Sequence, residues 1–265
     1  MRDLVREKGG IYFQASKQQY FTRRLRRRMK VLGCRELREY YDILLADTSH
    51  QEFSELLNIL TTTETYFFRN AQQLQSFEKD VLPALLQRKH ESGVSHIHIW
   101  SAGCSSGEEP YTLAMLLLEN IPDITKWRIS IVATDMNTEV LEKAKEGLYP
   151  IRSLRDTPRR YAIKYFTQEG EWYRIDEQVK RMVTFRPSNL VVPEETALIQ
   201  NVDCIFCRNV LIYFDVETCR NVVQMFYERM APKGYLFLGH SESLFRITAI
   251  FKLLKLQHSL VYYKE

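Results

Sequence analysis

A loop of small residues near the middle of the chain has the composition of a ligand-binding turn. An apolar run at residues 96–100 leads into residues 101–111, SAGCSSGEEPY, which open a predicted helix. Small residues let the backbone approach a ligand, and the N-terminus of a helix attracts negative charge. The glycines are Gly103 and Gly107, so the loop departs from the G-x-G-x-x-G pattern. By itself the loop is explained equally well as a tight turn between a strand and a helix.

Asp135 ends the next predicted strand, IVATD. A carboxylate at this place accepts hydrogen bonds from both ribose hydroxyl groups in nucleotide-binding sheets. The spacing from the loop leaves room for one crossover helix. Asp135 alone could also cap the following helix. Together, the loop and the carboxylate predict a nucleoside site at the carboxyl ends of parallel strands.

Other reactive side chains follow weaker patterns. Cys204 and Cys207 have the spacing of a redox or zinc motif, but no second ligand pair stands at a useful spacing, so we interpret them as core residues. His96 and His98 alternate along one predicted strand, where packing explains them better than ligation, and His240 stands in a predicted loop. We expect no metal site.

Composition limits the classes of protein to which the chain can belong. The 265 residues are 45% hydrophobic and 26% charged, and no apolar run reaches the roughly 18 residues of a membrane span. The N-terminus lacks the apolar core of a signal peptide, and the five cysteines are scattered and odd in number. We therefore expect a cytoplasmic protein with reduced thiols and no direct membrane insertion.

A basic run, RRLRRRMK at residues 23–30, exceeds the whole net charge of +4. Helical spacing puts four cations opposite an apolar stripe formed by Phe21, Leu25 and Met29. These cations are Arg23, Arg26, Arg27 and Lys30. Solvated surface charge, an acidic protein partner and nucleic acid are the alternatives. Because no aromatic stacking platform stands among the basic residues, we do not expect nucleic acid.

The order of predicted elements indicates a helical N-terminal region followed by an α/β domain. Helical periodicity continues to about residue 90, and short strands alternate with helices after Gly93. We expect strands at 96–101, 128–134, 203–207 and 235–238, helices at 108–120, 138–146 and 216–230, and a closing hairpin at 251–255 and 259–263. Runs at 172–175 and 182–186 predict a small β-rich insertion. This alternation means parallel strands with crossover helices, and the domain boundary falls within residues 70–93.

Five motifs give the sequence a family resemblance. They are TETYFFR at 63–69, the loop at 101–111, ATD at 133–135, FCRNVLIYF at 206–214 and LGHSES at 238–243. In order and spacing they resemble the chemotaxis receptor methyltransferase (CheR) family, over about residues 10–263. The resemblance implies methyl transfer from S-adenosyl-L-methionine to glutamate side chains of bacterial chemoreceptors. The products are glutamyl methyl esters, which serve sensory adaptation, and S-adenosyl-L-homocysteine.

The resemblance also implies the fold and the site. The fold class is α/β, with an all-helical N-terminal domain (1–75), a linker helix (76–93) and a doubly wound Rossmann-like methyltransferase domain (94–265) that carries a small antiparallel β-subdomain insertion (about 150–188). The implied cofactor contacts are Thr63, Thr65, Arg69, Ala102, Glu108, Asp135, Asn189, Leu190, Arg208 and Asn209. Arg69 and Tyr213 are the implied catalytic residues, which orient the acceptor carboxylate. Thr63 departs from the Asn that is frequent in the family.

The expected partner is the cytoplasmic helical bundle of a membrane chemoreceptor, docked on the four cations of the basic run. Some family members bind a peptide at the receptor C-terminus through the β-subdomain. The corresponding stretch here, 165–175 with Gly170, is short, so we expect no dependence on such a tether. We expect a monomer. A nucleic-acid methyltransferase and a non-catalytic receptor-docking module that senses the cofactor are the rival functions.

Overall fold

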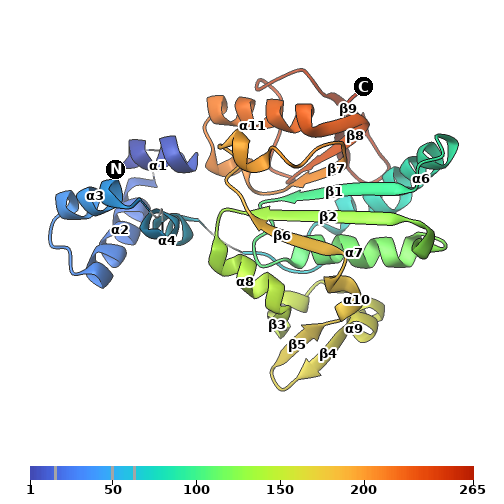
Figure 1. Cartoon of the computed structure of the whole chain (residues 1–265), viewed down its shortest axis with the longest axis horizontal. Helices are drawn as coiled ribbons and strands as arrows, with labels where there is room; N and C mark the ends of the chain where they lie inside the picture. Colours follow the sequence, from blue (N-terminus) through green and yellow to red (C-terminus); the bar gives the residue numbers. More distant parts are fainter. Residues whose placement is uncertain (15–16, 49–50, 62–63) are drawn as a thin grey trace.

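The N-terminal helices form a domain with a core of its own. The computed structural model describes residues 1–14, 17–48, 51–61 and 64–265 and shows these helices beside an α/β domain (Figure 1). They are α1 (Arg2–Gly9), α2 (Gln18–Leu32), α3 (Leu37–Ala46) and α4 (Gln51–Leu60). Helix α2 buries Phe21, Leu25 and Met29 at helical spacing and ends at Gly33, as the sequence predicts. Gly33 explains this end, because its φ of 74° is the left-handed conformation in which helices commonly terminate.

A long helical segment joins this domain to the sheet. It runs through α5 (Ala71–Ser76), a π-helical turn (Phe77–Val81) and α6 (Leu82–Glu91). Leu74, Phe77 and Leu85 belong to the core of the sheet. The expected domain boundary at residue 75 stays a prediction, which limited proteolysis would test.

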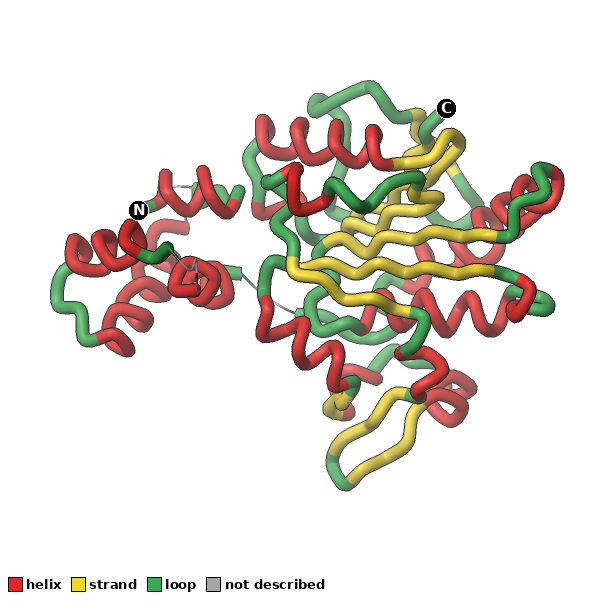
Figure 2. Tube along the Cα trace, in the orientation of Figure 1, coloured by secondary structure: helices red, strands yellow, loops and turns green. Residues whose placement is uncertain are grey.

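The main sheet has the strand order β6-β2-β1-β7-β8-β10-β9 (Figures 1 and 2). Its strands are β1 (His96–Ala102), β2 (Arg128–Asp135), β6 (Val183–Pro187), β7 (Val202–Cys207), β8 (Met230–Leu238), β9 (Lys252–Lys255) and β10 (Leu260–Tyr263). Strands β6, β2, β1, β7 and β8 are parallel, and β10 and β9 close the sheet as the expected antiparallel hairpin. The predicted α/β fold is therefore confirmed.

Helices cover both faces of this sheet because its strands are apolar on both sides. Helices α7 (Glu108–Asn120) and α8 (Thr138–Glu146) have the predicted bounds, and together with α6 they pack on one face. Helix α11 (Val216–Arg229) packs on the other face, over Trp100 (Figure 1). Cys204 and Cys207 are buried in β7. No helix in the described ranges is long and apolar enough to cross a membrane.

A small sheet with the order β3-β5-β4 projects from the domain (Figure 1). It contains β3 (Leu148–Pro150), β4 (Phe166–Glu169) and β5 (Trp172–Ile175), with helices α9 (Arg159–Tyr165) and α10 (Glu177–Lys180) beside it. The expectation that residues 182–186 belong to this insertion is wrong. Strand β6 pairs in parallel with β2, with Val183 opposite Ile131, because α10 returns the chain to the main sheet.

Candidate active site

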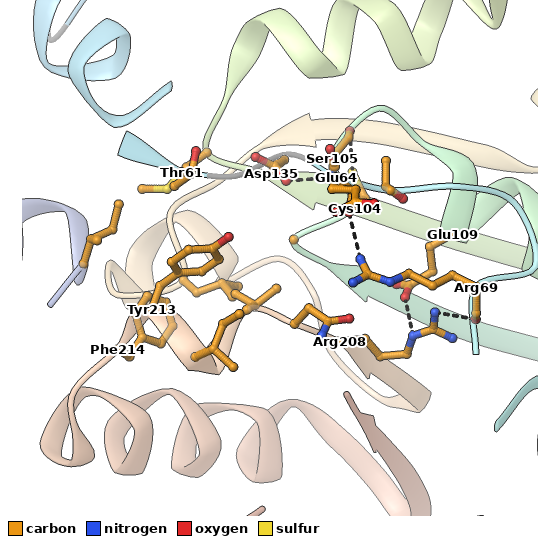
Figure 3. Close-up of a pocket in the computed structure, with 18 of the residues that line it drawn as sticks. Thr61, Glu64, Arg69, Cys104, Ser105, Glu109, Asp135, Arg208, Tyr213 and Phe214 are labelled. Carbon is orange, nitrogen blue, oxygen red and sulfur yellow. Dashed lines mark hydrogen bonds and ion pairs between the residues drawn. The ribbon is translucent and has the colours of Figure 1, made fainter. Parts of the chain in front are cut away.

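A cavity of about 370 Å³ opens at the carboxyl ends of β1, β2 and β7, against the helical domain (Figure 3). The strand order reverses between β1 and β7, and ligands of open α/β sheets bind at such a point. The volume lies within the roughly 300–1,000 Å³ typical of small-molecule sites. Ile11 and Lys17 from the helical domain contribute to the wall.

The loop that follows β1 is tightly packed against its neighbours. The backbone N–H groups of Gly103 and Cys104 donate to the carbonyl oxygen of Thr134 at 2.8 and 2.9 Å, which ties the loop to the end of β2. Gly103 has φ 82°, and a Cβ atom there would lie 2.4 Å from Val210 Cγ2. Both the dihedral angle and the neighbour require glycine, so the loop of β1 and the loop of β7 meet over the cavity.

Asp135 lies at the end of β2 on the cavity wall. Its Oδ2 accepts a hydrogen bond from Ser105 N at 2.8 Å, and its Oδ1 accepts one from Asn137 N at 2.9 Å. Burial raises the pKa of this carboxyl above its ordinary value, although hydrogen bonds from backbone N–H groups oppose the shift. Asp135 is thus oriented by the backbone and is still open to the cavity (Figure 3).

A nearly buried ion pair lies at the opposite end of the cavity. Glu109 Oε2 is 3.0 Å from Arg208 Nε, and Glu109 Oε1 accepts a hydrogen bond from Ser101 Oγ at 2.7 Å. Arg208 Nη2 donates to the carbonyl oxygen of Arg69 at 2.7 Å. Burial lowers the pKa of Arg208, whereas Glu109 opposes that shift. The pair joins α7, the end of β7 and the segment between α4 and α5 (residues 64–70, the interdomain segment) around one wall.

Asn209 follows Arg208 in a left-handed conformation with φ 63°. The Glu242 carboxylate fixes this turn by accepting hydrogen bonds from Asn209 N at 2.8 Å, Gly239 N at 2.6 Å and Ile212 N at 3.2 Å. Glu242 lies in the LGHSES motif, and its carboxylate therefore holds two loops of the site together.

Arg69 and Tyr213 approach the cavity from opposite walls (Figure 3). Arg69 Nη1 donates to the carbonyl oxygen of Glu64 at 2.8 Å. Phe67 and Phe68 are buried and anchor the same segment in the sheet domain. Tyr213 ends the short 3-10 helix Leu211–Tyr213, and its carbonyl oxygen accepts a hydrogen bond from Tyr12 N at 2.7 Å.

The N-terminal helical domain also contacts the part of the cavity rim that carries Asn189. Asn189 Nδ2 donates to the carbonyl oxygen of Lys8 at 2.8 Å. Arg6 forms an ion pair with Asp215 at 2.5 Å. The segment from Arg6 to Tyr12 therefore lies along the rim that carries Asn189 and Tyr213.

The structure brings most of the sequence-predicted residues together on the cavity wall. These are Thr65, Arg69, Asp135, Asn189, Leu190, Arg208, Asn209 and Tyr213. Ala102 and Glu108 lie behind the wall: Ala102 is fully buried, and Glu108 accepts hydrogen bonds from Ser106 and Ser153. Thr63 lies outside the described residues.

Sequence reasoning missed Glu109 and Glu242. The loop contains adjacent glutamates, and helical geometry turns their side chains in different directions, so the sequence alone could not say which faces the cavity. Glu242 acts through backbone N–H groups of residues that are distant in sequence, and such contacts leave no local pattern.

The four cations of the basic run lie exposed along α2, which also carries Arg28. Arg28 differs from them, because its guanidinium forms a two-point pair with Glu52 at 2.9 and 2.6 Å. Arg28 thus ties α2 to α4, while Arg23, Arg26, Arg27 and Lys30 face solvent, on the side opposite the apolar stripe.

Comparisons with known proteins agree with this architecture. Residues 63–260 match the family model of the CheR methyltransferase SAM-binding domain, and residues 1–61 match that of the CheR methyltransferase all-alpha domain. Chemotaxis protein methyltransferase 2 of Vibrio cholerae is 39% identical over 99% of this chain and 91% of its own. The chemotaxis protein methyltransferase of Borreliella burgdorferi is 37% identical over 91% of this chain and 86% of its own.

The chemotaxis protein methyltransferase of Escherichia coli is 33% identical over 94% of this chain and 85% of its own. Among solved structures, the N-methyltransferase NodS from Bradyrhizobium japonicum with S-adenosyl-L-homocysteine aligns with a TM-score of 0.38 and 12% identity, over 71% of this chain and 87% of that chain. The family models span nearly the whole chain. The chain therefore belongs to the CheR methyltransferase family and is an S-adenosylmethionine-dependent methyltransferase.

Proposed function

We propose that the protein esterifies glutamate side chains on the cytoplasmic helical bundle of chemoreceptors. The observation that carries this proposal is the pairing of Arg69 and Tyr213 across a cavity whose far wall holds Asp135. An arginine and a tyrosine hydroxyl are donors that suit a carboxylate acceptor. The identity of the family and the names of its relatives support the same substrate.

The cavity residues fit the parts of S-adenosylmethionine. Asp135 has carboxylate lone pairs for ribose hydroxyl groups beyond those that the backbone uses. Among the described residues, Arg208 Nη1 and Asn209 Oδ1 lack a hydrogen-bond partner. The methionine part carries a carboxylate, which suits a guanidinium, and an ammonium, which suits an amide oxygen. We assign Asn189 and Leu190 to the adenine.

Thr65 completes the proposed cofactor contacts on the interdomain side of the cavity. Ala102 and Glu108 support the loop from behind in this assignment. Thr63 is assigned to the methionine part from the family resemblance alone, with an altered hydrogen bond where other members have Asn.

The chemistry requires alignment more than proton transfer. The sulfonium of S-adenosylmethionine supplies an activated methyl group, and a glutamate is ionised near neutral pH. The residues of this chain hold the acceptor carboxylate in line and exclude water from it. In our assignment, Arg69 and Tyr213 orient that carboxylate from opposite walls, and no general base is required.

We further propose that the exposed cations of α2 dock the receptor. The hairpin of β4 and β5 turns at Gly170, which has φ 63°. So short a turn offers little room for a tether peptide. In this proposal the enzyme acts in the cytoplasm as a monomer and does not depend on a receptor C-terminal tail.

An alkali-lability assay tests the proposed function. The enzyme is incubated with S-adenosylmethionine labelled on the methyl group and membrane vesicles that carry an overproduced chemoreceptor. We expect labelled receptor that releases methanol in base, because methyl esters hydrolyse there. Label that survives base would indicate a methylated amine or nucleobase, and cofactor binding without any label would indicate a non-catalytic docking module.

A further inference from the structure

Arg155 contacts the interdomain segment from the side of the small sheet. It follows the 3-10 helix Ile151–Leu154, directly after β3. Its Cζ lies 3.6 Å from the centroid of the Tyr66 ring, and its Nη2 lies 3.1 Å from Glu64 Oε1. Arg155 itself is exposed and is absent from the described cavity wall, whereas Glu64 and Tyr66 belong to it.

Arg69 contacts the same two residues from the cavity side. Its guanidinium donates to the carbonyl oxygen of Glu64 at 2.8 Å and lies 5.6 Å from the centroid of the Tyr66 ring. The two arginines therefore share Glu64 and Tyr66. Arg155 uses the carboxylate and the ring, and Arg69 uses the carbonyl oxygen and the ring (Figure 3 shows Arg69 with Glu64).

The adjoining backbone is anchored independently of Arg155. Phe67 N donates to the carbonyl oxygen of Ser153 at 2.9 Å, and Phe68 N donates to Thr112 Oγ1 at 3.1 Å. These bonds fix the segment just after Tyr66. Loss of the Arg155 side chain would therefore loosen Glu64 and Tyr66 while leaving the fold around Phe67 in place.

We infer that Arg155 is a positioning residue for methyl transfer, which holds Glu64 and Tyr66 so that the Arg69 guanidinium keeps its direction toward the acceptor carboxylate. This inference rests on the proposed role of Arg69. An exposed ion pair and an exposed cation–π contact are each weak, so the expected effect is modest. It amounts to about a fivefold to tenfold loss of kcat.

Steady-state kinetics of the full chain test the inference, with labelled S-adenosylmethionine and the receptor vesicles described above. For Arg155→Ala we expect kcat to fall by about fivefold to tenfold, with the affinity for S-adenosylhomocysteine unchanged in calorimetry. Arg152→Ala is the matched control, because Arg152 is exposed in the short helix that immediately precedes Arg155 and carries the same charge. An equal loss in both variants would overturn the assignment.

Conservative variants separate the contacts. Tyr66→Phe keeps the ring and should retain most of kcat, whereas Tyr66→Leu should resemble Arg155→Ala. Arg155→Lys keeps the charge beside Glu64 but loses the flat stacking, so an intermediate rate is expected. Full activity of Tyr66→Leu would contradict the inference.

A double variant gives the decisive result. If Arg155 acts through Arg69, adding Arg155→Ala to Arg69→Ala should lower kcat no further. Additive losses would mean that Arg155 acts by another route. Should Arg69→Ala turn over at the wild-type rate, the proposed role of Arg69 fails as well. A slow Arg69→Ala with a normal Arg155→Ala would overturn only the role of Arg155.

Discussion

At the scale of single residues, Asp135 shows opposed requirements on one side chain. Burial raises its pKa and disfavours the ionised form, but the ionised form is the one that our assignment requires to accept two ribose hydroxyl groups. Hydrogen bonds from Ser105 and Asn137 offset part of the penalty. The residue is therefore oriented for a ligand at some expense to the stability of the ligand-free fold.

Replacement of Asp135 tests this role. Asp135→Ala removes two hydrogen bonds to a charged acceptor, roughly 1.5–3 kcal/mol each, so binding of S-adenosylhomocysteine should weaken by at least about tenfold. Because the pKa of Asp135 is raised, the carboxyl becomes protonated at a higher pH than an ordinary aspartate does. As pH decreases, the affinity of the wild-type protein for S-adenosylhomocysteine should therefore begin to fall at that higher pH. Calorimetry across about pH 4 to 8 checks both points. Equal affinity of a folded variant would remove Asp135 from the site.

Arg69 and Tyr213 are expected to affect chemistry more than binding. Arg69→Ala and Tyr213→Phe should lower kcat by about tenfold or more while the affinity for S-adenosylhomocysteine changes by less than about threefold. Both side chains face the acceptor in our assignment, whereas Asp135 faces the nucleoside. Single-turnover rates and calorimetry separate the two effects. A wild-type rate in either variant would show that its side chain does not orient the carboxylate.

Glu108 allows a test of how burial of an ionisable carboxyl affects the stability of the fold. It is 2% exposed, and burial raises its pKa. A raised pKa in the folded state means that its contribution to stability is present below the unfolded value, near 4.3, and is lost as pH rises through the folded value. Relative to Glu108→Gln, the wild-type free energy of unfolding should therefore decrease with rising pH. Urea unfolding without cofactor measures this; a difference that stays constant with pH would contradict it.

At the scale of elements, α2 has an apolar face that packs in the domain core and an exposed basic face, to which we assign receptor docking. Phe21, Leu25 and Met29 pack in the domain core, and Arg28 pairs with Glu52 of α4. Arg23, Arg26, Arg27 and Lys30 are exposed, and no ion pair joins them to a neighbouring helix among the described residues. The proposed docking face can therefore be altered without disturbing the packing of the helix.

A charge reversal of this face is the corresponding prediction. Arg23, Arg27 and Lys30 changed together to Glu should lower receptor methylation by about tenfold or more at moderate salt, because exposed charges attract over a Debye length of about 8–10 Å. Cofactor affinity should stay the same. Deleting the C-terminal tail of the receptor should leave the rate nearly unchanged. A micromolar complex with the isolated tail peptide, or an unaffected triple variant, would show that docking lies elsewhere.

The elements also show how far the sequence could be interpreted. The bounds of α8 were predictable because Asn137 and Gly147 cap the helix and its buried residues recur at helical spacing. Helix α7 was predictable from its continuous apolar run after Gly107, although it has no side-chain cap. Strand β6 was misassigned, since a short apolar run has no local feature that distinguishes a strand of the small sheet from one of the main sheet. Its partner β2 is about fifty residues away, and only the return through α10 decides the pairing. Glu242 was missed for a similar reason, because two of its hydrogen-bond partners, Asn209 and Ile212, are distant in sequence.

At the scale of the whole molecule, the shape of the cavity depends on how the N-terminal segment (residues 6–12) lies against its rim. Gly10 ends α1 with φ 71°, and a Cβ atom there would lie 2.5 Å from Val191 Cγ1. Ile11 and Tyr12 follow directly, at the cavity wall and beside Tyr213. Close packing at Gly10 thus positions the segment.

Substitution at Gly10 has a matched control in Gly33. Gly33 ends α2 with φ 74°, but a Cβ atom there meets nothing within 4 Å. Both changes to Ala cost roughly 1–2 kcal/mol of backbone strain, and Gly10→Ala adds the clash with Val191, so its melting temperature should fall further than that of Gly33→Ala. Only Gly10→Ala should also weaken binding of S-adenosylhomocysteine, by about threefold or more. Equal affinities in calorimetry would mean that the segment does not shape the cavity.

The hydrogen bond from Tyr12 to Tyr213 and that from Asn189 to Lys8 have a thermodynamic consequence. If the contact of the N-terminal segment with the cavity rim raises cofactor affinity by some factor, bound cofactor must favour that contact by the same factor. Helix α2 belongs to the docked domain, so its basic face keeps a fixed direction relative to the cavity more often in liganded molecules. Cofactor and receptor should therefore bind with positive cooperativity, each raising the affinity for the other by the same factor.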